Sequence, residues 1–212
     1  MILFKTETVI AFFLIWRIID GNDPGEDEIM TNSKTLILTR TALMASMIAV
    51  CSWITVPFVV PFTLQTFAVI TALETLGGKH GTRAIALYLL LGAAGLPVFS
   101  GFQGGIGKLL DSTGGYLLGF LLLGLIYQAA VSFFGDSFTV RVIALLTGQL
   151  VLYCAGTLWF AAVYSRANGP VTLWTVLCWC VFPFIGPDLV KLCAALLVSS
   201  ALRKALPTLQ TN

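Results

Sequence analysis

The hydrophobic residues of this chain gather into long segments separated by short stretches of glycine, proline and charged residues. A helix needs about 20 apolar residues to cross a bilayer, because it rises ~1.5 Å per residue through a core of ~30 Å. The third segment is short, because Pro97 ends it. We predict six membrane helices, near residues 36–55, 62–78, 82–96, 114–134, 140–164 and 186–203.

Two further apolar segments do not fit this series. The stretch 171–184 lies between the last two predicted helices, and it is compatible with an interfacial, a re-entrant or a seventh spanning segment. The run 9–19 has only eleven residues and no small-x-small cleavage site after it. We interpret residues 1–30 as an extension, either interfacial or upstream of a true start at Met30. Residues 31–206 would form the membrane domain and 207–212 a cytoplasmic tail.

Composition supports a membrane protein. The chain is 58% hydrophobic and 10% charged, with a mean hydropathy of +0.93, whereas soluble domains contain ~25% charged residues. The net charge of +2 and the lack of a basic run argue against nucleic acid binding. One histidine and five scattered cysteines form no metal-ligand set. The predicted fold class is an all-α integral membrane protein, a bundle of six transmembrane helices.

Loop charges orient this bundle. The loops on one side carry seven basic residues, and those on the other carry only Lys108 and Arg166. By the positive-inside rule the richer side is cytoplasmic, so both termini are predicted to lie in the cytoplasm. The seven are Lys34, Arg40, Lys79, Arg83, Arg141, Arg203 and Lys204.

This topology brings the unusual polar features to the outer face. The second, fourth and sixth helices begin there, close to Gln65, to the glycine-rich loop 101–115 between helices three and four, and to Asp188 with Lys191. These features are far apart in the sequence. A ligand pocket open to the outside is the simplest explanation for their convergence.

Asp188 and Lys191 form the sharpest part of this pattern. Spaced i, i+3, they share one face of a helix, and Pro187 before them suits a first helical turn. A charge at the helix centre costs ~2.5–3.5 kcal/mol in a membrane, so neither side chain should face lipid. Two interpretations stay open. The residues form an ion pair that only stabilises the bundle, or an amphoteric site for ligand N–H groups and oxygens.

The glycine-rich loop also has two interpretations. Glycines allow close backbone approach to a ligand and a lid-like loop, but a flexible connector has the same composition. The loop is not a phosphate-binding P-loop, because the upstream glycine of G-x-x-x-x-G-K-[ST] is absent and Leu109 replaces Ser or Thr. ATP hydrolysis by that route is therefore excluded.

Weaker signals have structural alternatives. A glutamine such as Gln65 often joins membrane helices, and an interfacial tryptophan such as Trp53 is often a belt residue. Glu74 lies near the cytoplasmic end, and we expect a structural role in which Lys79 or Arg83 neutralises it. In the first helix, small residues four apart allow another helix to approach: Ala42 with Ser46, and Ala45 with Ala49.

Four motifs in this order resemble the BioY family, the biotin-specific substrate-binding components of energy-coupling-factor (ECF) transporters. They are VPFTLQT within 56–66, YLLLGAAGLPVFSGFQGGIG at 88–107, TGGYLLGF at 113–120 and FIGPDLVK at 184–191. The resemblance covers roughly residues 31–206. It implies a non-enzymatic vitamin-capture subunit in the bacterial cytoplasmic membrane, with biotin as transported ligand and no cofactor.

The resemblance also implies site residues and partners. Ala45 and Ala49 would dock on a transmembrane coupling subunit, and two cytoplasmic ATPase subunits would supply the energy. The ureido ring of biotin suits a carboxylate acceptor and an amide or ammonium donor, and either Lys108 or Lys191 could bind its carboxylate. The predicted ligand-binding set is Gln65, Thr63, Phe62, Trp53, Phe102, Gln103, Gly104, Gly105, Lys108, Tyr116, Asp188 and Lys191.

The sequence departs from the family pattern at two places. The usual Pro-Gly-Asp is Gly-Pro-Asp at 186–188, and the usual Gly-Pro-Thr-Gly-Gly is Asp-Ser-Thr-Gly-Gly at 111–115, which adds a loop charge. Three alternatives therefore remain: the same scaffold for another vitamin or a dicarboxylate, a small intramembrane enzyme using Asp188 and Lys191, and a self-sufficient carrier. The last is disfavoured by the lack of inverted repeats.

Overall fold

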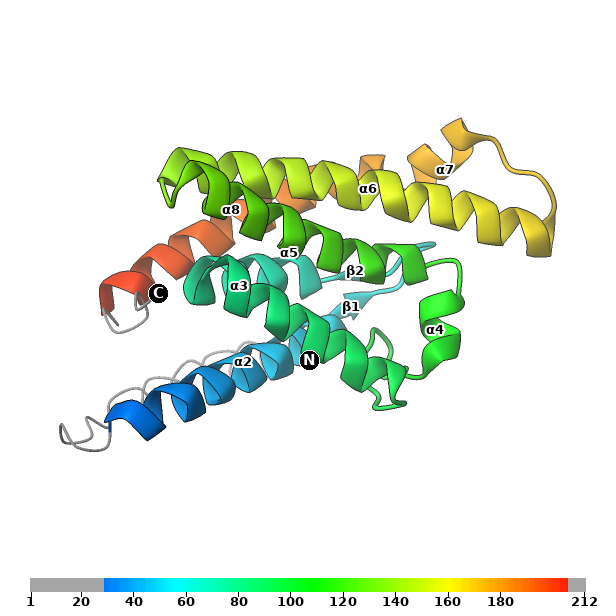
Figure 1. The fold of residues 1–212 in the computed structure, drawn as a ribbon. Coiled ribbons are helices and arrows are strands. Elements are labelled where there is room, and N and C mark those ends of the chain that lie inside the picture. Colours follow the sequence, from blue (N-terminus) through cyan, green and yellow to red (C-terminus); the bar gives the residue numbers. More distant parts are fainter. Residues whose placement is uncertain (1–28, 206–212) are drawn as a thin grey trace.

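The computed structural model describes residues 29–205, which form a bundle of helices with one short β-hairpin (Figure 1). Residues 1–28 and 206–212 lie outside the described residues, and with them nearly all of the predicted extension and the predicted cytoplasmic tail. The elements in chain order are α2 (Ile29–Trp53), β1 (Thr55–Val56), β2 (Phe62–Thr63), α3 (Gln65–Ala93), α4 (Ile106–Leu110), α5 (Gly114–Phe134), α6 (Phe138–Asn168), α7 (Leu173–Cys180) and α8 (Phe182–Ala205).

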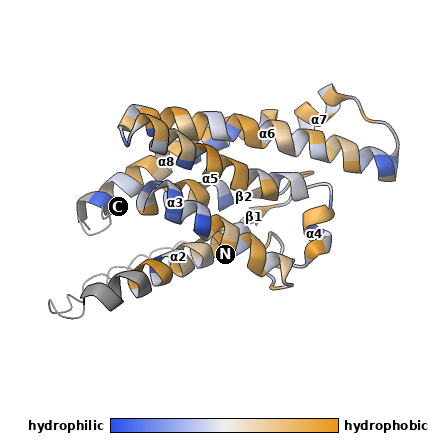
Figure 2. Ribbon diagram, viewed as in Figure 1, coloured by the Kyte–Doolittle hydropathy of each residue, from blue (hydrophilic) through white to orange (hydrophobic). Residues whose placement is uncertain are grey.

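The predicted helical membrane fold is confirmed in its main features. Within residues 29–205, four helical stretches are long and apolar enough to cross a membrane: Thr35–Trp53, Gly114–Phe134, Phe138–Asn168 and Leu173–Arg203. Hydrophobic residues dominate most of the length of α5 and α6 (Figure 2). Such helices leave no unpaired backbone groups in lipid, because each peptide bonds within its own helix.

Helix α3 consists of two segments that meet at Gly77. This residue has φ 75° and ψ 169°, a conformation that glycine adopts without a steric penalty. A Cβ at Gly81 would lie 2.7 Å from the Cα of Leu73, although residues eight apart in a straight helix are ~12 Å apart. The chain therefore reverses at Gly77. The second and third predicted helices correspond to 65–76 and 78–93, joined by one residue instead of a loop.

Two helix starts differ from the prediction. The second helix begins at Gln65 rather than residue 62, because Phe62 pairs with Val56 in the antiparallel hairpin of β1 and β2. The last helix begins at Phe182, so Pro187 lies inside α8 and not in its first turn. The intervening stretch 171–184 consists of α7 and the start of α8. With eight residues, α7 reaches only ~12 Å and does not cross a bilayer alone.

The helices pack unevenly around the bundle. Helix α3 contacts α2, α5 and α8, and α5 packs along α6. Among the described elements, α6 and α8 do not pack closely on each other. Buried side chains such as Ile85, Tyr88, Leu123 and Leu145 form the core. The space that α6 and α8 leave between them is where the polar residues described below converge.

Glu74 is the centre of a buried ionic network. Its carboxylate accepts a hydrogen bond from the hydroxyl of Tyr127 at 2.8 Å and lies 3.2 Å from Nε of Arg141. The guanidinium of Arg203 donates to the backbone carbonyl of Glu74 and lies 3.9 Å from its carboxylate. The expected structural role fits this position, but the predicted partners Lys79 and Arg83 were wrong. Helix packing brings arginines from α6 and α8 closer.

The predicted docking residues on α2 are buried within the bundle. Ala45 and Ala49 are 2% and 7% exposed, whereas Ala42 and Ser46 lie on the exposed face of the helix. Helix α2 packs on α3, and the two buried alanines allow this close approach within the chain. Their position therefore does not support the predicted contact with a coupling subunit.

Replacing Gly78 with alanine should destabilise the contact between α3 and α5. A Cβ there would lie 2.6 Å from the Cα of Gln128, which is backbone and does not move away easily. Overpacking of this kind costs ~1–3 kcal/mol, which thermal unfolding in detergent would detect. Gly186→Ala in α8 is the matched control, since nothing lies within 4 Å of its Cβ position. Equal stability of the two variants would contradict this packing.

Candidate ligand-binding site

A cavity lies between the N-terminal end of α3, the start of α5, α6 and the start of α8. Residues from the hairpin and from the segment between α3 and α5 complete its wall. Its lining residues are Val60, Pro61, Thr63, Gln65, Thr66, Phe99, Ser100, Lys108, Thr113, Tyr116, Leu117, Phe120, Leu152, Tyr153, Cys180, Phe184, Asp188 and Lys191. Segments separated by more than 100 positions in the sequence thus share one site, as the predicted topology required.

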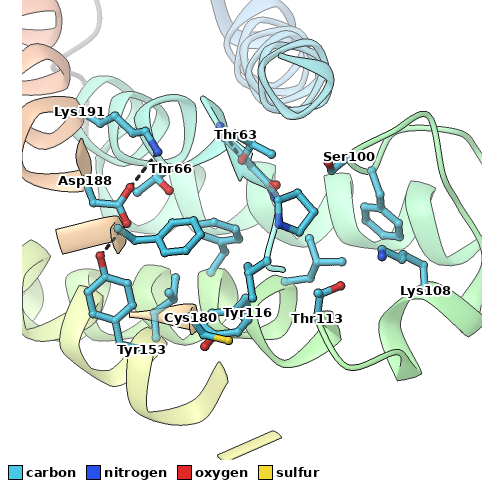
Figure 3. A pocket seen from close by; sticks show the side chains of 18 residues that line it. Thr63, Thr66, Ser100, Lys108, Thr113, Tyr116, Tyr153, Cys180, Asp188 and Lys191 are labelled. Carbon is cyan, nitrogen blue, oxygen red and sulfur yellow. Dashed lines mark hydrogen bonds and ion pairs between the residues drawn. The ribbon is translucent and has the colours of Figure 1, made fainter. Parts of the chain in front are cut away.

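The cavity has two polar ends. Figure 3 shows Asp188, Lys191 and Tyr153 at one end and Lys108, Ser100 and Thr113 toward the other. Aromatic and aliphatic side chains lie along the wall, among them Phe99, Leu117, Phe120, Leu152 and Phe184. An elongated ligand with a polar group at each end and an apolar centre would match this distribution.

Asp188 is held by donors from two helices. Nζ of Lys191, one turn further along α8, lies 2.8 Å from Oδ1 of Asp188. From α6, the hydroxyl of Tyr153 donates to Oδ2 at 2.7 Å, and Nε2 of Gln149 donates to the same oxygen at 3.2 Å. These side chains bridge α6 and α8 where the backbones do not pack. The two interpretations of the Asp188–Lys191 pair are compatible, because the ion pair forms and both residues line the cavity.

Lys191 has a second partner in Phe62. Its ammonium lies 3.8 Å from the centroid of the Phe62 ring, a cation–π contact. The Phe62 ring also lies 5.8 Å from that of Phe184, which lines the cavity. Phe62, a predicted ligand residue, therefore positions Lys191 and does not line the cavity itself.

Gln65 presents an unused hydrogen-bond donor at the cavity. It is the first residue of α3 and only 3% exposed. Within the described part of the chain, its side-chain Nε2 is buried without a hydrogen-bond partner. Such a group is rare in native structures and costly, because burial removes its water. An acceptor oxygen on a bound ligand would satisfy it.

Lys108 forms the other charged end of the cavity. It belongs to the short helix α4, and its Nζ lies 2.9 Å from Oδ2 of Asp111. The backbone N–H of Ser112 donates to the other oxygen of this carboxylate. Partial burial raises the pKa of Asp111, but the hydrogen bonds from Lys108 and Ser112 outweigh it, and the pKa lies below the usual 3.8. Asp111 is therefore ionised at neutral pH.

Tyr116 anchors the wall of the cavity between its two ends. Its hydroxyl lies 3.2 Å from the hydroxyl of Thr157 on α6, so α5 and α6 are joined beside the site. A Cβ at Gly156 would lie 2.2 Å from the Tyr116 ring, which means that only glycine admits this ring position. Cys180 lines the same wall as a buried, small side chain.

Five of the predicted ligand residues do not line the cavity: Trp53 ends α2, and Phe102, Gln103, Gly104 and Gly105 lie in the loop before α4. The rings of Trp53 and Phe102 stack at 4.9 Å, and the Trp53 indole donates to the carbonyl of Pro97. Gln103 exchanges backbone hydrogen bonds with Phe99, and the N–H of Gly105 donates to the carbonyl of Gly92 at 2.7 Å. A Cβ at Gly104 would lie 2.2 Å from the carbonyl of Leu96. Gly104 and Gly105 therefore make close backbone contacts within the chain.

Several residues of the site were not predicted from the sequence. Thr66, Ser100, Thr113 and Phe184 line the cavity without being singled out. Gln149 and Tyr153 were also missed, although a polar pair spaced i, i+4 in an apolar helix is a recognisable signal. Their role depends on the tertiary structure, which places Asp188 of α8 opposite them.

The cavity is small as it stands. Its volume is about 80 Å³, whereas pockets for drug-sized ligands measure ~300–1,000 Å³. A vitamin-sized ligand therefore needs lining side chains or the loop before α5 to shift outward. Two lining residues are available to bind such a ligand. Gln65 has an unused donor, and Lys108 is in a partly exposed ion pair.

Comparison with known proteins identifies relatives over almost the whole described chain. The model of the BioY family matches residues 27–208. The biotin transporter BioY of Thermotoga maritima is 36% identical over 172 residues, covering 79% of this chain and 95% of that protein. The probable biotin transporter BioY of Pyrococcus horikoshii is 39% identical over 144 residues, covering 68% of this chain and 81% of the relative.

A solved structure has a similar fold. It is the crystal structure at 2.1 Å of the S-component for biotin from an ECF-type ABC transporter. The superposition has a TM-score of 0.72 with 28% sequence identity, and it covers 83% of this chain and 95% of that one. The similarity in fold therefore extends over most of the chain.

Proposed function

The chain belongs to the BioY family, and we propose that it is a biotin-binding subunit of a vitamin uptake transporter. This function is supported above all by the cavity that Gln65 lines, with Asp188 and Lys191 at one end and Lys108 toward the other (Figure 3). The relatives are transporters, and one similar structure is a biotin S-component. Nothing therefore favours the alternative of an intramembrane enzyme.

The polar groups of biotin match the two ends of the cavity in one orientation. Its ureido ring offers two N–H donors and one carbonyl, which suits Asp188 as acceptor and the unpaired Gln65 amide as donor. Its thioether ring packs against the apolar wall. Its carboxylate reaches Lys108, because Lys191 is already engaged by Asp188 and by the Phe62 ring. Buried polar partners of this kind give strong selectivity, since an analogue that lacks them strands one partner.

The membrane arrangement in this proposal has six helices. They are α2, the two segments of α3, α5, α6 and α8. The segment 65–76 reaches only ~18 Å, so the β-hairpin occupies the remaining depth on the cavity side. At the other end of the bundle, Lys79, Arg141 and Arg203 line a second polar cavity. That concentration of basic residues supports a cytoplasmic position for this end, with both termini inside a cytoplasmic membrane.

Energy for uptake would come from other subunits. In this proposal biotin enters from outside, and an ECF coupling subunit with two ATPase subunits releases it inward. The chain supports this division of labour because it contains no P-loop. The exposed small residues Ala42 and Ser46 of α2 are better placed for a coupling subunit than the buried Ala45 and Ala49.

Equilibrium binding to the purified chain in detergent tests this function. Titration with biotin should show one saturable site, and a dicarboxylate such as pimelate or an unrelated vitamin should not compete. Competition by pimelate at equal affinity would assign the scaffold to a precursor instead. Biotin uptake by vesicles that contain this chain alone would favour a self-sufficient carrier.

A further inference from the structure

Each cation at the cavity is paired with a carboxylate of the same chain. Lys108 and Lys191 are the cations among the lining residues. Lys191 lies 2.8 Å from Asp188, and both side chains are nearly inaccessible. Lys108 lies 2.9 Å from Asp111, where the side chains are 16% and 46% exposed. An anionic ligand group must therefore displace or share one of these two pairs.

The pair at Lys191 resists exchange. Asp188 accepts three hydrogen bonds, from Lys191, Tyr153 and Gln149, and the ammonium of Lys191 faces the Phe62 ring. Moving Lys191 away would leave a buried carboxylate with less compensation, which is costly. Exposed ion pairs contribute little by comparison. Lys108 is therefore the cation that a ligand carboxylate can take.

Asp111 stays close to Lys108 because its backbone is held. Its carbonyl accepts hydrogen bonds from the indole of Trp159 on α6 and from the N–H of Gly114, both at 2.9 Å. Its carboxylate also accepts from the N–H and the hydroxyl of Ser112. The negative charge therefore remains beside the cavity when a ligand enters.

We propose that Asp111 is a specificity-determining residue that competes with the ligand's own carboxylate for Lys108. The inference rests on the proposed function and deepens it. The negative charge of Asp111 repels an anionic ligand group and offsets part of its attraction to Lys108. A neutral ligand of the same shape meets no such opposition. Asp111 thus narrows the difference in affinity between a carboxylate ligand and its neutral analogue.

Binding of biotin and of neutral biotin amide to the purified full chain tests this role. Asp111→Asn should tighten biotin binding roughly two- to fivefold, the range of an exposed ion pair, and leave the affinity for the amide unchanged. Lys108→Met should weaken biotin binding and spare the amide. In the Lys108→Met background, Asp111→Asn should have no further effect, because the shared cation is gone.

The matched control is Asp136→Asn, which makes the same change in net charge on an exposed carboxylate outside the cavity. It should alter neither affinity. The inference is overturned if Asp111→Asn weakens biotin binding, or if it changes the affinities for biotin and for the amide by the same factor. Biotin binding by the wild-type chain would still support the proposed function in that case. If the wild-type chain binds no biotin, the proposed function falls and this inference falls with it. Thermal unfolding of each variant separates a folding defect from an effect on affinity.

Discussion

Asp188→Asn is expected to weaken biotin binding severely. Asparagine removes the charge that compensates the buried Lys191 ammonium, and it replaces an acceptor oxygen with a donor where Tyr153 and Gln149 already donate. The ligand's ureido N–H groups also lose their acceptor. Truncating one partner of a buried hydrogen-bonded charge pair costs ~2–5 kcal/mol, which is roughly a 30- to 5,000-fold loss in affinity.

Isothermal titration of the purified variant would measure this loss, with Lys191→Ala as its counterpart on the same pair. Tyr153→Phe removes a single donor and should cost far less, ~1 kcal/mol. All three variants should still insert in the membrane, which membrane fractionation and thermal unfolding would check. Wild-type affinity in Asp188→Asn would refute the placement of the ligand at this end of the cavity.

Glu74→Ala is expected to be the most destabilising single substitution considered. The carboxylate is 3% exposed and lies within reach of Tyr127, Arg141 and Arg203. Removing it leaves the two arginines with only the exposed Asp136 as a shared anion. Breaking a buried ion pair from one side costs ~3–5 kcal/mol, and the effect should appear in the free energy of unfolding in detergent.

Asp136→Asn is the matched comparison for Glu74→Ala. Asp136 pairs with the same two arginines, Arg141 at 3.0 Å and Arg203 at 3.6 Å, but its side chain is 57% exposed. Exposed pairs are worth ~0–1 kcal/mol, so the two variants should differ by several-fold in their stability cost. Equal losses of stability in the two variants would contradict the burial of Glu74 and its role in joining the helices.

The helices that could be predicted best are those that a long hydrophobic segment defines by itself. The stretches 36–55, 114–134 and 140–164 correspond to α2, α5 and α6, because a bilayer requires ~20 apolar residues in a helix whatever packs beside it. The reversal at Gly77 and the two-residue strands of the hairpin carried no comparable signal. They depend on contacts between Gly81 and Leu73 and between Phe62 and Val56, which no local pattern encodes.

The residues of the cavity could likewise be predicted only in part from the sequence. Topology alone was sufficient to bring Gln65, Lys108, Asp188 and Lys191 to one side, because polar groups in a membrane chain have few tolerable positions. It was not sufficient to separate them from Trp53 and Phe102, which stack on each other outside the cavity. The glycines of the loop were equally ambiguous, since the same conformational freedom serves a ligand or the chain's own backbone.

The sequence by itself determined that this chain enters a membrane as helices, which face holds its polar residues, and to which family it is related. These follow from hydrophobic length, charge distribution and motif order, all of which are properties of the linear chain. Only the tertiary structure decided the partners: Tyr153 and Gln149 for Asp188, Asp111 for Lys108, and two arginines for Glu74. Hydrogen bonds and ion pairs act over about 3 Å, so the choice among several suitable side chains belongs to the packing of the helices.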